Sequence, residues 1–263
     1  MEGILIHTDN TPQRYRLRNF RMGVPGFCDY WYLLVKDYID REITRESDKF
    51  AAITGLAKRT AELTVYTYIA GLWLEDMHKG LLWSSREFGR QSTTYTAPSW
   101  TWISLRNGGP DSGIYDGIYR LHKRDTSYDL VIHECKVFHI DDNIWSTCTG
   151  GYLIATGLWR TADPWPGSPL PHITIGPWLM GPILEFDLQR DCEPVEYIKA
   201  PICYLQVAKW WSYEEGGDSS VFTLILEPTG ENDAEYRRIG RAEIPQFNFM
   251  AQEGWIRKTV MIV

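Results

Sequence analysis

The sequence lacks long hydrophobic runs and an excess of basic residues. The apolar stretch over residues 202–208 is interrupted by Gln206 and followed by Lys209, whereas a membrane-spanning helix needs about 20 apolar residues. The N-terminus is acidic and lacks the basic start and long apolar segment of a secretory signal. We therefore expect no membrane partner and a cytoplasmic location.

The chain carries a net charge of −7, which disfavours binding along a nucleic-acid backbone, because that needs clustered Lys and Arg. One basic cluster interrupts this balance and consists of Arg14, Arg16, Arg18 and Arg21. Such a cluster is more typical of a solvated arm that docks on an acidic surface. We expect no nucleic-acid partner.

The sequence also lacks the motifs of common cofactor, metal and nucleophile sites. Its five cysteines show no C-x-x-C spacing, which favours reduced, mostly buried thiols over a zinc site or a disulfide framework. No Gly-rich loop has dinucleotide or Walker spacing, and Ser99 stands outside a Gly-x-Ser-x-Gly motif. The sequence predicts that the protein uses no metal and no cofactor.

Aromatic residues, in contrast, are abundant: 12 Trp, 15 Tyr and 9 Phe among 263 residues. Rings of this kind bury large areas and offer polar tips, so they suit cores, interfaces and apolar ligand pockets alike. For any single tryptophan, a place in the core is the more common role.

Hydrophobic periodicity predicts helices in the first part of the chain and strands in the second. Apolar stripes at helical spacing cover residues 29–38, a segment that begins near 44–47, and 74–83. Alternation predicts strands at 98–103, 129–139, 151–159, 182–187, 201–210, 220–227, 235–243 and 255–263. We expect an α+β fold, with a mainly helical region over 1–95 and a β-rich region over 96–263 in one compact unit. The strands should form a predominantly antiparallel barrel or sandwich behind a short helical layer.

Six blocks in the first part of the chain follow one another in a specific order. They are Trp31–Tyr38, Arg41–Thr44, Ser47–Ala57, Tyr68–Trp73, Leu81–Trp83 and Ala97–Trp102. Their order and spacing resemble the region that follows the heterokaryon-incompatibility (HET) domain in large fungal proteins. Two later blocks, Gly151–Gly157 and Tyr236–Gly240, resemble the C-terminal part of that family.

The HET domain itself is thought to signal cell death through a TIR-like fold, and it would precede Trp31. Only thirty residues stand there, so none of its functional residues can be assigned to this sequence. The resemblance implies that the chain carries the C-terminal half of such a protein, without the signalling domain.

A few residues are candidates for chemistry. His133, Cys135 and His139 lie at even spacing on one predicted strand, but about 20 Å separates the two histidines, so the three cannot hold one metal ion. The acidic stretch 141–143 is either a turn capped by its own side chains or a source of an acid or base beside His139. Capping is the more common role.

Two functions follow as alternatives. The first is binding and cofactor-independent conversion (cyclisation, isomerisation or dehydration) of a hydrophobic small molecule in fungal specialised metabolism. Its acid–base candidates are His133, His139 and Asp111, and its substrate-lining candidates are Trp100, Trp102, Tyr115, Trp159 and Trp178. The Pro-rich segment 161–181 would either cover or line the site or serve only as a rigid connection. The second is a non-catalytic recognition module of a heterokaryon-incompatibility (self/non-self) system, which acts in trans on a protein partner. An inactive remnant of the family is a third possibility.

Overall fold

The structure is a computed structural model that describes residues 27–39, 46–83, 90–91, 95–106, 126–141, 143–162, 183–186, 202–210, 219–245 and 254–263. Several predicted features lie outside these residues: the arginine cluster, Asp111, Tyr115, Trp178 and the Pro-rich segment from residue 163 onward. Their predicted roles stay predictions.

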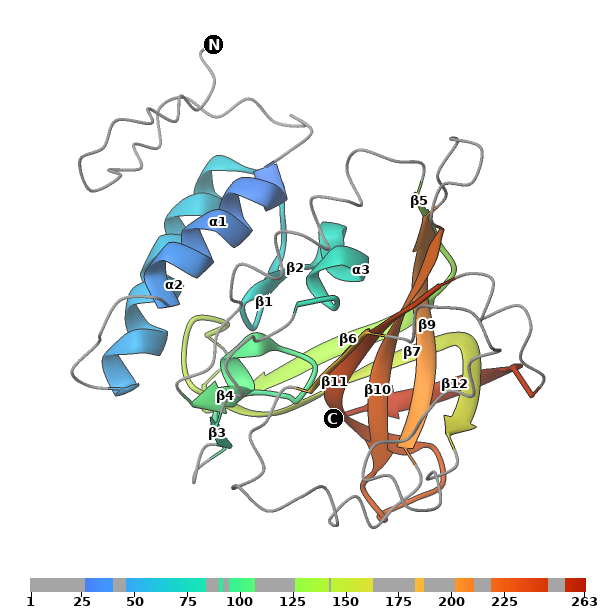
Figure 1. Cartoon of the computed structure of the whole chain (residues 1–263). Helices are drawn as coiled ribbons and strands as arrows, with labels where there is room; N and C mark the ends of the chain where they lie inside the picture. The colour runs from blue at the N-terminus through green and yellow to red at the C-terminus, as the bar shows by residue number, and fades with distance from the viewer. Residues whose placement is uncertain are drawn as a thin grey trace.

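Helices occupy the first part of the described chain (Figure 1). Helix α1 (Phe27–Ile39) and helix α2 (Glu46–Leu63) lie side by side, and the short helices η1 (Leu74–Asp76) and α3 (Met77–Gly80) follow. The predicted helices are confirmed, since apolar side chains three or four residues apart, such as Trp31 and Val35 in α1, are buried.

A small hairpin connects α2 to α3. Strands β1 (Tyr68–Ile69) and β2 (Leu72–Trp73) pair around Ala70 and Gly71, whose φ angles are 43° and 89°. A side chain at Gly71 would come within 2.7 Å of Ile103 Cδ1. Both the turn geometry and the close contact therefore require glycine at this position.

The second part of the chain forms one large sheet. Its strands are β5 (Thr126–Tyr128), β6 (Val131–His139), β7 (Cys148–Ala162), β8 (Ile183–Phe186), β9 (Ile202–Trp210), β10 (Ser220–Pro228), β11 (Glu235–Pro245) and β12 (Ile256–Ile262). The order is β5-β9-β10-β11-β12-β7-β6, and β8 pairs with β11. All pairs are antiparallel except β11 with β12. The predicted α+β class is confirmed.

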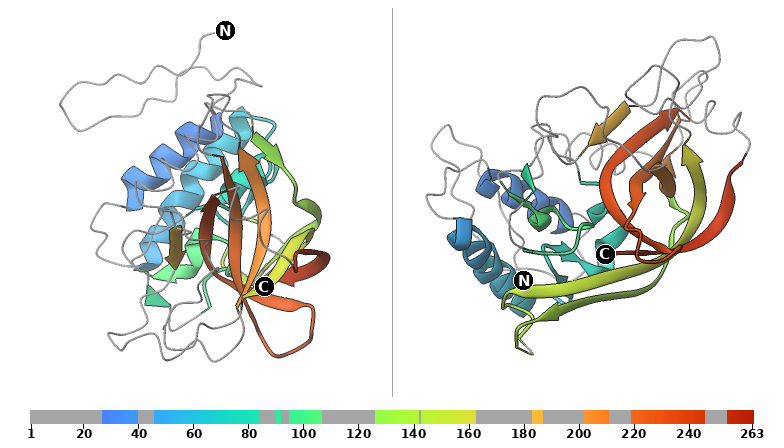
Figure 2. Two further views of the ribbon diagram at one scale, coloured as in Figure 1. Left: turned by 45° about the vertical axis from the view of Figure 1, so that its right-hand side comes forward. Right: turned by 90° about the horizontal axis from the view of Figure 1, so that it is seen from below.

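Strand β7 determines the shape of the sheet (Figure 2). It spans 15 residues and pairs with β6 along its first part and with β12 along its middle. Its last residues, Trp159–Ala162, pair with β9. The sheet therefore curls back on itself. A further two-stranded sheet joins β3 (Arg90–Gln91) to β4 (Leu105–Arg106).

The strand predicted at residues 98–103 is wrong. The chain turns there and enters the short helix η2 (Trp102–Ser104). The main-chain amides of Thr101 and Ser104 bond to carbonyl groups three residues earlier, so the backbone is satisfied locally. Thr101 is fully buried like its neighbour Trp100; the alternation of aromatic and polar residues thus creates no solvent-exposed face.

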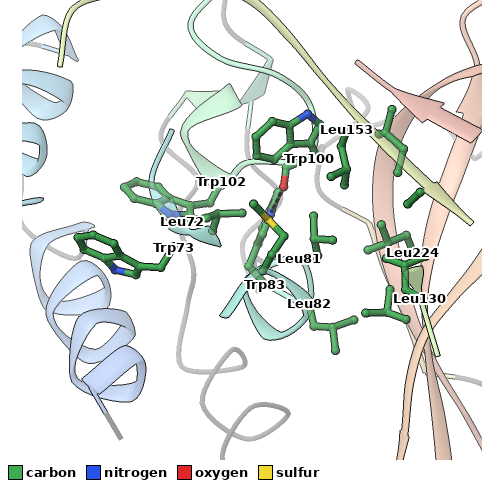
Figure 3. Packing of buried hydrophobic residues seen from close by; sticks show 14 of the residues in the cluster. Leu72, Trp73, Leu81, Leu82, Trp83, Trp100, Trp102, Leu130, Leu153 and Leu224 are labelled. Carbon is green, nitrogen blue, oxygen red and sulfur yellow. Dashed lines mark hydrogen bonds between the residues drawn. The ribbon is translucent and has the colours of Figure 1, made fainter. Parts of the chain in front are cut away.

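Each face of the sheet carries a buried apolar cluster. The helix-facing face packs Leu153, Leu205, Leu224 and Val260 against the aromatic residues of the helical part (Figure 3). The opposite face, here called the second face, has its own apolar cluster. That cluster consists of Ile202, Tyr204, Val221, Ile225, Ile239, Ala242 and Ile244, with Leu158 and Trp255 packed against it.

Tryptophans from the resemblance blocks meet in the helix-facing core. Trp31 Nε1 and Trp102 Nε1 both donate to the carbonyl of Gly71, at 3.2 and 3.0 Å. Trp83 Nε1 donates to the carbonyl of Trp100 at 3.0 Å, as Figure 3 shows. These residues thus hold the helical part together.

Arg238 of β11 joins the sheet to this core. Its buried guanidinium donates to the carbonyls of Leu81 and Trp83 and lies 3.6 Å from the centre of the Trp83 ring. Its main-chain amide donates to Ser99 Oγ at 2.9 Å, and the amide of Ser99 donates to the carbonyl of Val263 at 3.1 Å. The helical part and the sheet therefore share one core.

Candidate functional site

Three of the tryptophans predicted to line a substrate site, Trp100, Trp102 and Trp159, lie on the helix-facing side. Trp100 and Trp102 are 0% and 3% exposed within the core. Trp159 pairs with Leu205 across the β7–β9 junction, and the Lys258 ammonium lies 4.3 Å from the centre of its ring. In this structure the three rings serve packing, and a role in substrate binding stays a prediction.

The two predicted catalytic histidines lie on β6. His133 is exposed, and its Nε2 lies 2.7 Å from Thr156 Oγ1, which is 2.6 Å from Thr259 Oγ1. Thr156 follows Ala155, which is buried on the helix-facing side, so the histidine contacts the second face. The structure therefore places His133 and these three tryptophans on opposite faces of the sheet.

His139 ends strand β6 and is half-buried. Its Nδ1 lies 3.0 Å from the carbonyl of Ser146, so it helps to close the β6–β7 turn. Asn143 Oδ1 accepts a bond from the amide of Trp145 at 3.1 Å; capping of this turn by its own side chains is confirmed at that residue. Six residues of strand keep His139 and His133 too far apart to act on one atom.

The second face carries three polar side chains that are fully buried, Tyr204, Gln206 and Thr223. Tyr204 Oη, Gln206 Oε1 and Thr223 Oγ1 have no hydrogen-bond partner among the residues that the structure describes. Gln206 of β9 lies directly opposite Thr223 of β10, and Tyr204 occupies the next position of the same face. We call these three residues the polar trio.

The polar trio occupies facing and successive strand positions of the second face, whereas Trp73 Nε1 and Trp100 Nε1, which are also buried without a partner, belong to the helix-facing core. Side chains directly opposite each other in a sheet have Cβ atoms about 4.5–5.5 Å apart. Residues two apart on one strand are separated by about 6.6 Å. The three unpaired groups are therefore close enough to bind one molecule together.

Asp129 fixes the orientation of the Gln206 amide. Gln206 Nε2 donates to Asp129 Oδ2, and Lys209 Nζ lies 3.2 Å from the same oxygen. A β-bulge in β9, at Val207 between the pairs Gln206–Thr223 and Ala208–Phe222, brings Gln206 and Lys209 to one face. Because the amide nitrogen faces a carboxylate, Gln206 Oε1 is left as a pure acceptor.

Burial keeps the Tyr204 phenol in its neutral form. Burial raises its pKa well above the ordinary value of 10, and the positive charge of Arg160, opposite Tyr204 on β7, offsets this only in part. Tyr204 and Thr223 can each donate one proton and also accept. The polar trio thus offers two hydroxyl groups and one acceptor within a buried apolar cluster.

The sequence contained one signal for this site. Gln206 interrupts an apolar stretch whose residues 202–208 are all buried. Tyr204 and Thr223 stand in equally ordinary strand patterns, and nothing local shows that their hydroxyl groups lack partners. Their convergence depends on the pairing of β9 with β10.

The described residues also bear on other classes of site. No three or more His, Cys, Asp and Glu side chains in the described segments are grouped so as to hold a metal ion. None of the helices in that part of the chain is long and apolar enough to cross a membrane.

Comparisons of the chain with protein-family models, with curated proteins and with solved structures give no significant match. The resemblance to the region after the HET domain therefore stays a prediction. Function has to be argued from the geometry of the site.

Proposed function

We propose that the protein binds a small, mostly apolar molecule with a hydroxyl group, and that this group is recognised by the polar trio. The observation that carries the proposal is the set of three fully buried polar atoms without partners on neighbouring positions of the second face.

Unpaired polar atoms are costly in a protein interior. More than about 90% of buried polar groups have a hydrogen-bond partner, and leaving one unsatisfied costs roughly 1–3 kcal/mol. A ligand hydroxyl would remove this cost, since it can donate to Gln206 Oε1 and accept from Thr223 or Tyr204. An apolar surface with a few convergent polar groups is typical of small-molecule sites.

The same arrangement predicts selectivity. A site built to hydrogen-bond a hydroxyl strongly rejects the analogue that lacks it, because the polar groups of the protein then stay unpaired. The neighbouring side chains Ile202, Val221, Ile225 and Ala242 favour an apolar body on the ligand.

Chemical conversion of such a ligand stays a prediction, and so does the alternative recognition role in trans. Thr156, the partner of His133, lies four residues along β7 from Arg160, which faces Tyr204. That spacing corresponds to about 13 Å from the position opposite Tyr204, whereas Gln206 lies nearer, since its main-chain oxygen is 2.9 Å from where a Cβ on Gly157 would be. The contact of His133 is with the Thr156 hydroxyl, so the proposal concerns binding and assigns no step to His133.

The test is thermal unfolding, followed by circular dichroism, with a panel of bicyclic and sesquiterpene alcohols. Each alcohol is measured beside the hydrocarbon that lacks its hydroxyl. We expect at least one alcohol to raise the unfolding temperature more than its hydrocarbon does. In Thr223→Val and Tyr204→Phe this difference should shrink, because each variant removes a hydroxyl of the polar trio.

Thr156→Val is the matched control, since it removes a hydroxyl from the same sheet face that contacts His133 and Thr259. This variant should keep the full response to the alcohol. Equal shifts with alcohols and hydrocarbons, or an unchanged alcohol response in both trio variants, would contradict the proposal.

A further inference from the structure

We propose that the free edge of β6 pairs with the β6 edge of a second copy of this chain, to form a two-fold symmetric antiparallel dimer. In the described part of the chain, β6 pairs with β7 and with no other strand. Figure 2 (right) shows β6 at the margin of the sheet, beside β7. Such an edge presents unpaired main-chain groups to a second strand.

The charges on β6 select one register. Glu134 and Lys136 are both exposed and lie opposite Ile154 and Tyr152 of β7, so they share the second face. In an antiparallel pair centred on Cys135, Glu134 of each copy lies opposite Lys136 of the other. A register centred on either charged residue would instead place like charges opposite each other.

Opposite charges on directly facing positions stabilise a strand pair, and like charges destabilise it. The preferred register therefore forms two favourable ion pairs that are related by the two-fold axis. A two-fold interface uses the same patch on both subunits, so this self-complementary pattern is what such an interface requires.

The local structure of β6 permits the pairing. Residues 134–138 keep an unbroken register with β7, between irregularities at residues 132–134 and 138–139. Tyr152 Oη donates to Glu134 Oε1 at 2.7 Å, and Lys136 Nζ lies 5.3 Å from the centre of the Phe138 ring. Both contacts keep the charged side chains on the second face, and Tyr152 occupies one oxygen of the Glu134 carboxylate, so that the other oxygen can face the lysine of a partner strand.

The experiment uses the full chain and measures its mass by analytical ultracentrifugation over a concentration series. We expect the wild-type chain to dimerise, and the single variants Glu134→Lys and Lys136→Glu to dimerise at least about tenfold more weakly, because each places like charges opposite each other. The double variant Glu134→Lys/Lys136→Glu should dimerise like the wild type.

Mixing the two single variants gives the decisive result. One variant then carries two lysines at these positions and the other carries two glutamates, so opposite charges face each other again and the two variants should associate. Circular dichroism of each variant confirms that it is folded. Glu231→Lys and Lys58→Glu make the same charge changes at other exposed positions and should leave dimerisation unchanged.

Three outcomes would overturn the proposal. The wild-type chain stays monomeric throughout the series, the single variants dimerise as well as the wild type, or the mixed variants fail to associate. The first would mean that the irregularities and charges of β6 protect the edge from pairing. The second or third would place any dimer contact on another surface.

Discussion

Replacing Thr223 by valine should stabilise the protein in the absence of ligand. The Thr223 hydroxyl is fully buried and has no hydrogen-bond partner, so the folded state loses its hydration without compensation. Valine has nearly the same shape and no polar group. The substitution thus removes the desolvation cost and creates no cavity.

The expected gain follows from the cost of an unsatisfied buried group, about 1–3 kcal/mol. In a protein of this size, 1 kcal/mol changes the unfolding temperature by roughly 2–4 °C. We therefore expect Thr223→Val to raise the unfolding temperature by about 2–12 °C, and the urea midpoint to rise without a change in the m value.

Thr156→Val provides the contrast, because the Thr156 hydroxyl contacts both His133 and Thr259. Its loss should destabilise the protein by about 1 kcal/mol. If Thr223→Val destabilises the protein by as much as the control does, the Thr223 hydroxyl is already hydrogen-bonded, and the argument for the polar trio fails.

Three further predictions concern the core and its thiols. Arg238→Met should cost about 3–5 kcal/mol in urea unfolding, because two buried carbonyl groups lose a charged donor; a loss no larger than that of the exposed Arg59→Met would refute this. Gly151→Ala should destabilise the protein strongly, since the new Cβ would lie 2.7 Å from a main-chain oxygen. Gly150→Ala is the control, because its Cβ would meet only a side chain at 3.2 Å. Equal unfolding temperatures of the two variants would show that the close main-chain contact is not what makes glycine necessary at residue 151. Burial raises the pKa of the Cys203 thiol from 9.0 to about 11. The free energy of unfolding should therefore fall as the pH rises between these two pKa values, by up to about 1.4 kcal/mol per pH unit. In urea titrations under reducing conditions, Cys203→Ala should make the free energy of unfolding less dependent on pH over this range.

Much of the fold could be predicted because its strands and helices have clear local patterns. β9 and β10 are apolar runs bounded by polar segments, and their predicted ends differ from the observed ones by one residue or less. The local sequence patterns do not predict which of these strands pair with each other. The contact of β7 with β9 joins residues that lie far apart along the chain, such as Trp159 and Leu205, and no periodicity encodes it.

The segment 98–103 shows where periodicity misleads. Its aromatic residues alternate with Ser99 and Thr101, as in a strand with one wet face. Tertiary packing decides otherwise, because the core surrounds Thr101 as completely as it surrounds Trp100. The Trp83 indole bonds to the main-chain carbonyl of Trp100, a group that a strand would commit to a neighbouring strand.

The same limit applies to the site. Aromatic content indicated that tryptophans were available for a ligand, but it could not separate the core from a binding surface. The polar trio could not be predicted from the sequence, because its members are common strand residues. What makes them candidates for a site is that their buried polar groups lack partners. Such an absence depends on the whole fold.

The proposed binding site and the proposed dimer edge lie on one sheet face, yet they are separate. β7 joins them, since Tyr152 near its start contacts Glu134 of the edge, and Arg160 near its end faces Tyr204 of the trio. Eight residues of strand separate the two positions, which is about 26 Å. A partner strand added beside β6 would lengthen the second face at its exposed end and leave the buried end unchanged. Dimerisation would thus enlarge the surface of the assembly without occupying the ligand site.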